Sequence, residues 1–121
     1  MRYDLFFIPA ALLCLLTGVS LGMWMGIAHD FTLSPVHAHL NLLGWVTLAA
    51  YGLMHRAYPE LASSRLAGAQ CVLAIGSSVA MPLGIAYAMA THNPIVATIA
   101  ALGVFSAALT FLIMFARKAK A

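Results

Sequence analysis

The stretch VHAHLNLLGWVTLAAYGLMHRA at residues 36–57 contains one formally charged side chain, Arg56, and it decides the fold. A transmembrane helix needs about 20 mostly apolar residues, so this stretch is long enough to cross a bilayer. Three other stretches of similar length and composition lie at residues 5–28, 66–90 and 95–116. The connections between them are short, which makes consecutive helices antiparallel neighbours. We therefore predict an all-α membrane protein, a four-helix up-down bundle in which residues 1–121 form one transmembrane domain.

The composition of the whole chain excludes a water-soluble globule. Of the 121 residues, 64% are hydrophobic and 7% are charged, and the mean hydropathy is +0.98. So few charged side chains cannot cover the surface of a soluble domain of this size. The two cysteines, Cys14 and Cys71, fall within predicted spans and are interpreted as small buried hydrophobic residues.

The basic residues predict the orientation of the chain in the membrane. They are Arg2 before the first span, Arg56 and Arg65 at the second connection, and Arg117, Lys118 and Lys120 after the fourth span. The first and third connections contain no lysine or arginine. By the positive-inside rule, we predict a multi-pass protein of the inner membrane with both termini in the cytoplasm. The net charge of +3 therefore reports topology, and the expected partner is membrane lipid, with no nucleic acid.

Small residues recur at every fourth position along two of the spans. The positions are Gly18, Gly22 and Gly26 in the first span and Gly76, Ala80 and Gly84 in the third. Such faces let helix backbones approach closely, so we interpret them as packing surfaces. A flat face of this kind can also accommodate a planar cofactor or a neighbouring protomer.

Most of the histidines fall on the predicted outer side of the membrane. These are His29, His37, His39 and His92. Ionisable groups at membrane depth are candidates for function, and neutral imidazole is the commonest protein ligand for metals. Histidines in connections, as His29 and His92 are, more often face solvent or form hydrogen bonds. The fifth histidine, His55, precedes Arg56 and is interpreted as a residue at the level of the lipid headgroups.

His37 and His39 lie two positions apart at the start of the second span. Ser34 followed by Pro35 is typical of an N-cap and a first helical position. The positive end of the helix dipole disfavours imidazolium, so both rings are expected to be neutral. At about 100° per residue the two side chains point about 200° apart, so they cannot easily bind one metal ion together.

The two faces of this span have different residues. The face of His37 continues through Asn41, Gly44, Leu48, Tyr51 and His55, several of which are polar or small. The face of His39 continues through the apolar residues Leu43, Val46, Ala50 and Leu53. A helix that directs one ligand to each side suits a ring of repeated subunits with a cofactor in each crevice.

Residues 37–45, HAHLNLLGW, with Tyr51-Gly52 and Tyr58-Pro59-Glu60 after them, resemble the second helix of the catalytic subunit of the heme-copper oxidase superfamily. The nearest branch is that of the nitric oxide reductases, where the pattern is H-x-N-L-L, an aromatic residue, a tyrosine and then P-E at the helix exit. The resemblance implies that His39 is the axial ligand of a low-spin heme. The candidate cofactor-binding residues are His37, His39, Asn41, Leu43 and Gly44.

The superfamily's catalytic subunit has twelve helices with approximate threefold symmetry, and its tenth helix carries H-x-H with rings that serve hemes on opposite sides. The resemblance therefore implies a single-repeat relative that assembles as a homotrimer. In this trimer His37 of one protomer and His39 of the next would clasp one b-type heme iron. Such a six-coordinate iron favours electron transfer or a heme-holding role. Ligation by His39 and His92 within one protomer is the competing geometry.

One departure from the superfamily argues against reductase activity. The reducing centre of that superfamily needs a second metal held by histidines on other helices, and the first, third and fourth spans here contain no internal histidine. We therefore predict no catalytic residues.

Two other functions are compatible with the sequence. One is a copper or zinc site in a membrane transporter or assembly factor. Its ligands would come from His29, Asp30, His37, His39 and His92, with Met23 and Met25 nearby as thioethers suited to Cu(I). The other is a structural subunit without a cofactor, in which the histidines only form interface hydrogen bonds.

Overall fold

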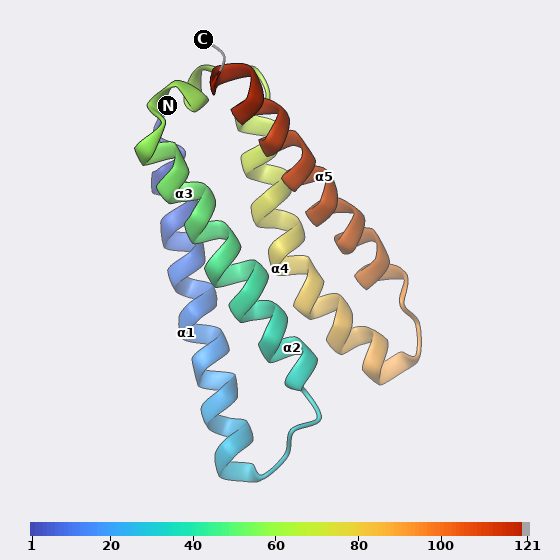
Figure 1. Ribbon diagram of the computed structural model, residues 1–121. Coiled ribbons are helices and arrows are strands. Elements are labelled where there is room, and N and C mark those ends of the chain that lie inside the picture. The colour runs from blue at the N-terminus through green and yellow to red at the C-terminus, as the bar shows by residue number, and fades with distance from the viewer. Residues whose placement is uncertain (120–121) are drawn as a thin grey trace.

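The computed structural model describes residues 1–119, and all of its regular elements are helices (Figure 1). In chain order they are α1 (Asp4–Ala28), α2 (Ser34–His39), the π-helix η1 (Leu40–Thr47), α3 (Leu48–Ala57), the 3-10 helix η2 (Pro59–Ser63), α4 (Ala67–Thr91) and α5 (Ile95–Ala119). No strand occurs in this part of the chain. The all-α prediction is therefore confirmed, and the long helices begin and end close to the predicted bounds.

Within residues 1–119, three helices are long and apolar enough to cross a membrane, namely α1, α4 and α5. Their apolar side chains are mostly outside the protein core. Leu13, Val72 and Phe105, for example, are 66%, 75% and 67% exposed. Burying that much apolar surface requires lipid or another subunit, because the chain itself does not cover it. The chain is therefore a helical membrane protein.

The second predicted span is helical from residue 34 to residue 57, but it is composite. We call it the composite helix, made of α2, η1 and α3 in succession. Its middle third is a π-helix, in which the Thr47 hydroxyl donates to the Leu42 carbonyl five residues earlier at 2.8 Å. The sequence did not predict this segment, which widens the helix in the stretch after His39.

The predicted cap at the start of the composite helix was wrong. The helix begins one residue earlier than expected, at Ser34, with Leu33 as the capping residue. The Ser34 hydroxyl donates to the Phe31 carbonyl at 2.7 Å and makes no capping hydrogen bond. Pro35 still lies in the first turn, where its missing N–H costs nothing.

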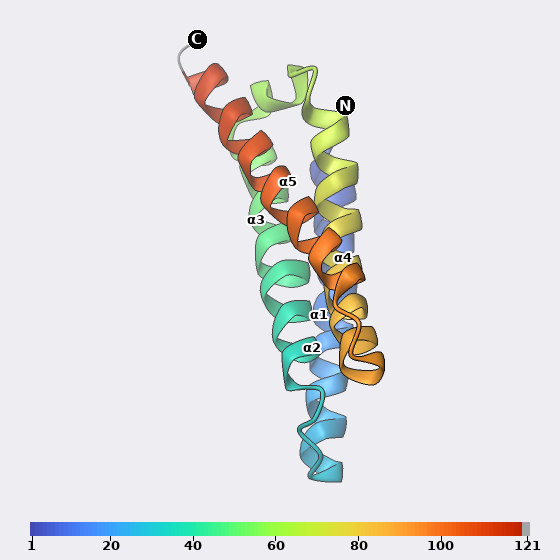
Figure 2. The same ribbon diagram turned by 90° about the vertical axis from the view of Figure 1, so that its right-hand side faces the viewer.

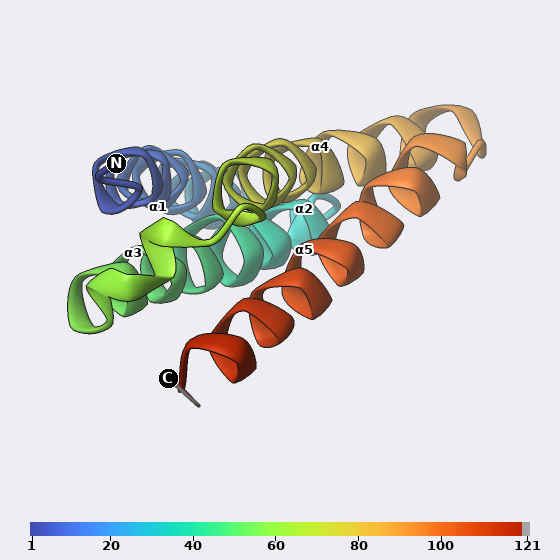
Figure 3. The same ribbon diagram turned by 90° about the horizontal axis from the view of Figure 1, so that it is seen from above.

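The four long helical segments form two hairpins. The composite helix packs along α1, and α5 packs along α4. Figure 3 shows α1 and α4 along one side of the molecule and α3 and α5 along the other, while Figure 2 shows α5 inclined to α4. The composite helix also contacts α4, whereas its π-helical segment and α5 diverge.

The buried core lies at the end of the molecule that holds the start of α1 and the end of α5. Its largest fully buried side chains include Phe7, Leu48, Leu61 and Met114. They come from the start of α1, the start of α3, η2 and the end of α5 (Figure 1).

The basic side chains gather at the core end. Lys118 Nζ donates to the Ser63 hydroxyl at 2.8 Å, which ties α5 to η2, and Arg2 pairs with Asp4. The N-terminus, η2 and the end of α5 lie at the same end of the molecule in Figure 1. Lys120, which contributed to the topology prediction, lies outside the described residues.

The glycine faces are packing surfaces only in part. A methyl group on Gly18, Gly22 or Gly84 would approach a neighbouring helix to within 2.5–2.8 Å, so these three glycines permit close contact. Gly26 and Gly76 have nothing within 4 Å. The prediction of helix packing within the chain is therefore confirmed for Gly18, Gly22 and Gly84 and wrong for Gly26 and Gly76.

Candidate functional site

His37 is held against α1 by one hydrogen bond, from Nδ1, and its ring also contacts Asn41 of its own composite helix. Its Nδ1 lies 2.7 Å from the Gly18 carbonyl oxygen, and that oxygen can only accept, so Nδ1 carries the proton. The Asn41 amide Nδ2 then donates to Nε2 at 3.2 Å. The ring also fills the space left by Gly22, where a methyl group would come within 2.8 Å of Cε1. His37 is thus a neutral, half-buried side chain in the interface between α1 and the composite helix.

The side chain of His39 projects from the side of the composite helix opposite to His37. Its Nδ1 donates to the Pro35 carbonyl at 2.7 Å, which fixes the tautomer and leaves the lone pair on Nε2. The separation of the two histidines onto opposite faces agrees with the spacing argument.

His39 lines a groove of about 450 Å³ between the composite helix and the α4–α5 hairpin. We call it the His39 groove. Leu42 and Leu43 of η1, Met81 of α4, and Ala101, Val104, Phe105 and Ala108 of α5 form the rest of its lining. Every lining residue except His39 is apolar. The groove therefore offers one imidazole nitrogen in an otherwise hydrocarbon-like space.

The five candidate residues do not form one site. Leu43 lines the His39 groove, whereas Asn41 contacts His37 on the α1 side. Gly44 is buried against Cys14 of α1, where a methyl group would approach the cysteine Cβ to 2.6 Å. The candidate residues therefore lie in two places, the His39 groove and the interface with α1.

The first and third connections do not bring their possible metal ligands together. His29 and His92 are exposed and end α1 and α4 in the left-handed backbone conformation. Asp30 accepts hydrogen bonds from the hydroxyl and the backbone N–H of Thr32, and these bonds lower the pKa of the Asp30 carboxyl. Across residues 1–119 no three His, Cys, Asp or Glu side chains come together to hold a metal ion.

We predict that His92→Gly stabilises the protein and leaves any cofactor at His39 in place. His92 has φ 59°, a conformation that glycine adopts without the steric cost of a side chain. The expected gain is about 0.5–1 kcal/mol, seen as a small rise in Tm of the detergent-solubilised protein. Ala90→Gly, inside the same helix, should lower Tm instead because glycine weakens a helix interior. A His92→Gly protein with lower Tm and altered absorption would assign a binding role to His92.

Two features of the structure were missed by sequence reasoning. Met81 shares the His39 groove, and methionines in so apolar a chain carried no signal that singled it out. His55 was interpreted as a headgroup-level residue, but it is 5% exposed and neither ring nitrogen has a hydrogen-bond partner. The sequence offered one indication that His55 is buried, because His55 lies on the same helix face as His37.

Comparisons with protein-family models, with curated proteins and with solved structures found no match to this chain.

Proposed function

We propose that the chain is a four-span inner-membrane protein that binds a b-type heme in the His39 groove and serves in electron transfer or as a heme holder. The observation that carries this proposal is the Nε2 lone pair of His39 in a groove with no other polar lining residue. In this proposal the composite helix is the fourth membrane span, and both termini lie in the cytoplasm.

The residues of the groove fit a heme in two respects. Histidines that ligate a metal generally donate their other ring N–H to a carbonyl or carboxylate, and the bond from His39 Nδ1 to Pro35 has that form. The leucine, alanine, valine and phenylalanine side chains provide an apolar surface of the kind that buries a porphyrin face. When bound, the heme would supply reversible one-electron redox chemistry.

The second axial ligand in this proposal is His37 of a neighbouring protomer in a homotrimer. His39 is the only histidine among the described residues that line the groove, so a second imidazole has to come from elsewhere. His37 is neutral and proton-bearing on Nδ1, which suits ligation through Nε2. The Asn41 amide would have to turn away from Nε2 for this to occur.

Met81 is the thioether that competes for the second axial position, because it lines the same groove as His39. Histidine–methionine ligation raises the reduction potential of a heme relative to bis-histidine ligation. The two forms differ in the near-infrared charge-transfer band of the iron–thioether bond, which bis-histidine heme lacks.

The absorption spectrum and mass of the purified protein test the proposal. Protein from heme-replete cells is expected to be red, with sharp reduced bands of a low-spin b-type heme, and to elute with the mass of a trimer. A colourless preparation would contradict heme binding. Copper or zinc without heme in a metal analysis would instead favour the transporter or assembly-factor function.

A further inference from the structure

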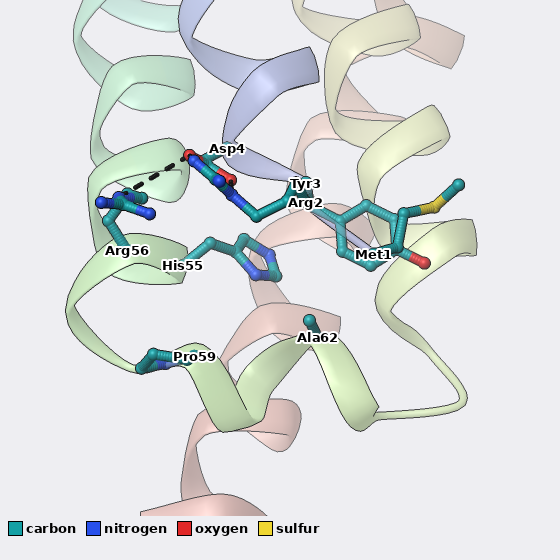
Figure 4. A pocket seen from close by; sticks show the side chains of 8 residues that line it. All are labelled: Met1, Arg2, Tyr3, Asp4, His55, Arg56, Pro59 and Ala62. Carbon is teal, nitrogen blue, oxygen red and sulfur yellow. Dashed lines mark hydrogen bonds and ion pairs between the residues drawn. The ribbon is translucent and has the colours of Figure 1, made fainter.

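A second candidate site lies at the core end of the molecule, far along the composite helix from His39 (Figure 4). It is a pocket of about 200 Å³ between residues 1–4, the end of α3 and η2. We call it the His55 pocket. Figure 4 shows the His55 ring between the N-terminal residues and the η2 residues Pro59 and Ala62, with Arg2, Asp4 and Arg56 beside it.

The imidazole of His55 is packed among aromatic rings, but its nitrogens have no hydrogen-bond partner. Its ring stacks on Phe7 with centroids 5.7 Å apart, meets the edge of Phe111 at 5.7 Å and lies 5.4 Å from the ring of Tyr3. Neither Nδ1 nor Nε2 has a hydrogen-bond partner, although the side chain is buried. Burying an N–H donor without an acceptor costs free energy, so an acceptor supplied by a bound molecule or ion would stabilise this arrangement.

The charges around the pocket favour an anion. Arg2 donates to both Asp4 oxygens, at 2.9 and 2.7 Å, and Arg56 Nε lies 3.8 Å from the same carboxylate. One carboxylate therefore lies between two guanidinium groups, so the side chains of Arg2, Asp4 and Arg56 together carry one excess positive charge. The arginine side chains are 58% and 60% exposed, so their remaining N–H donors are accessible to a ligand.

We propose that the His55 pocket binds a phosphate group. A phosphodiester carries one negative charge, which would balance the excess positive charge of Arg2, Asp4 and Arg56. Its oxygens can accept hydrogen bonds from the His55 N–H and from the arginine side chains. The pocket is several times the volume of about 30 Å³ that one water takes in the liquid, so the group fits. This end carries the lysine and arginine residues that the structure describes, and phospholipid headgroups of the adjacent leaflet would lie beside them. The phosphate could therefore belong to a lipid or to a free phosphate ion.

The test is thermal unfolding of the full-length protein in detergent with three additives. Phosphatidylglycerol is the lipid source, inorganic phosphate is the free source, and diacylglycerol is the control without phosphate. We expect phosphatidylglycerol or inorganic phosphate to raise Tm by a few degrees and diacylglycerol to have no effect. The arm that responds identifies the source of the phosphate.

Three variants connect the response to the pocket. His55→Phe keeps an aromatic ring for stacking but removes both nitrogens, and its apparent phosphate affinity should fall roughly tenfold. The apparent phosphate affinity of Arg56→Gln should fall by a similar factor. Arg65→Gln removes a charge from the same connection but outside the pocket, so it should respond as the wild type does.

Without additive, His55→Phe is expected to be at least as stable as the wild type, because it removes two unsatisfied buried atoms. Equal stabilisation of the wild type, His55→Phe and Arg56→Gln would overturn the proposal, and so would a wild type that responds to neither phosphate source. If His55→Phe fails to fold, the Tm responses of Arg56→Gln and Arg65→Gln to the phosphate sources still test the proposal. Equal responses of these two variants would overturn it.

Discussion

Replacing His39 with alanine is expected to remove the heme from the purified protein. His39 is the one polar residue of its groove, and its Nδ1 bond to Pro35 leaves Nε2 as the available ligand atom. Alanine leaves an apolar groove with no imidazole, so the iron loses its ligand from the groove and keeps at most the His37 imidazole of a neighbouring protomer. The heme-to-protein ratio, measured by absorption of the reduced pyridine complex, should fall to background.

The control for His39→Ala is His92→Ala. His92 is exposed at the end of α4 and does not line the groove, so its replacement should leave the heme bands unchanged. Loss of the bands in His92→Ala would favour ligation by His39 and His92 within one protomer. Intact low-spin bands in a folded His39→Ala protein would contradict the proposed role of His39.

Gly84→Ala is expected to destabilise the α4–α5 hairpin. A methyl group there would come within 2.7 Å of the Ala97 backbone nitrogen and 2.9 Å of its Cα. Backbone cannot rotate away as a side chain can, so the two helices must separate, at a cost of about 1–3 kcal/mol. Because α5 forms one wall of the His39 groove, heme retention should weaken together with Tm.

Gly76→Ala is the matched control on the same helix. Gly76 has nothing within 4 Å of an added methyl group, so this variant gains the higher helix propensity of alanine without a clash. Its Tm should equal or exceed that of the wild type. A Gly84→Ala protein that is as stable as Gly76→Ala would show that the hairpin is looser than the contacts indicate.

The helices were predictable because apolar length alone determines them. A run of about 20 apolar residues has to satisfy its backbone hydrogen bonds internally, so α1, α4 and α5 follow from hydropathy. The placement of His37 and His39 on opposite sides was predictable as well, because α2 is a regular α-helix with a fixed rotation per residue.

Other features depend on contacts between helices, which local sequence does not specify. The hydrogen bond between His37 and the Gly18 carbonyl requires α1 to lie alongside, and the π-helix around Leu42 and Thr47 lies in contact with α1. The periodicity of small residues marked Gly18 and Gly84 correctly, but it also marked Gly26 and Gly76, which face no neighbour. The burial of His55 among aromatic rings likewise follows from where α1 and α5 pass its helix.

The most direct test of the central claim, a heme shared by His37 and His39 of adjacent chains, is co-expression of His37→Ala and His39→Ala proteins with different affinity tags. Each variant alone lacks one of the two ligands at every site. In a mixed trimer, however, a His39→Ala chain supplies His37 to a neighbour that supplies His39, which completes a single site. We predict that complexes purified through both tags regain the bis-histidine absorption bands that the separate variants lack. Mixed complexes that form but stay without these bands would contradict ligation between protomers.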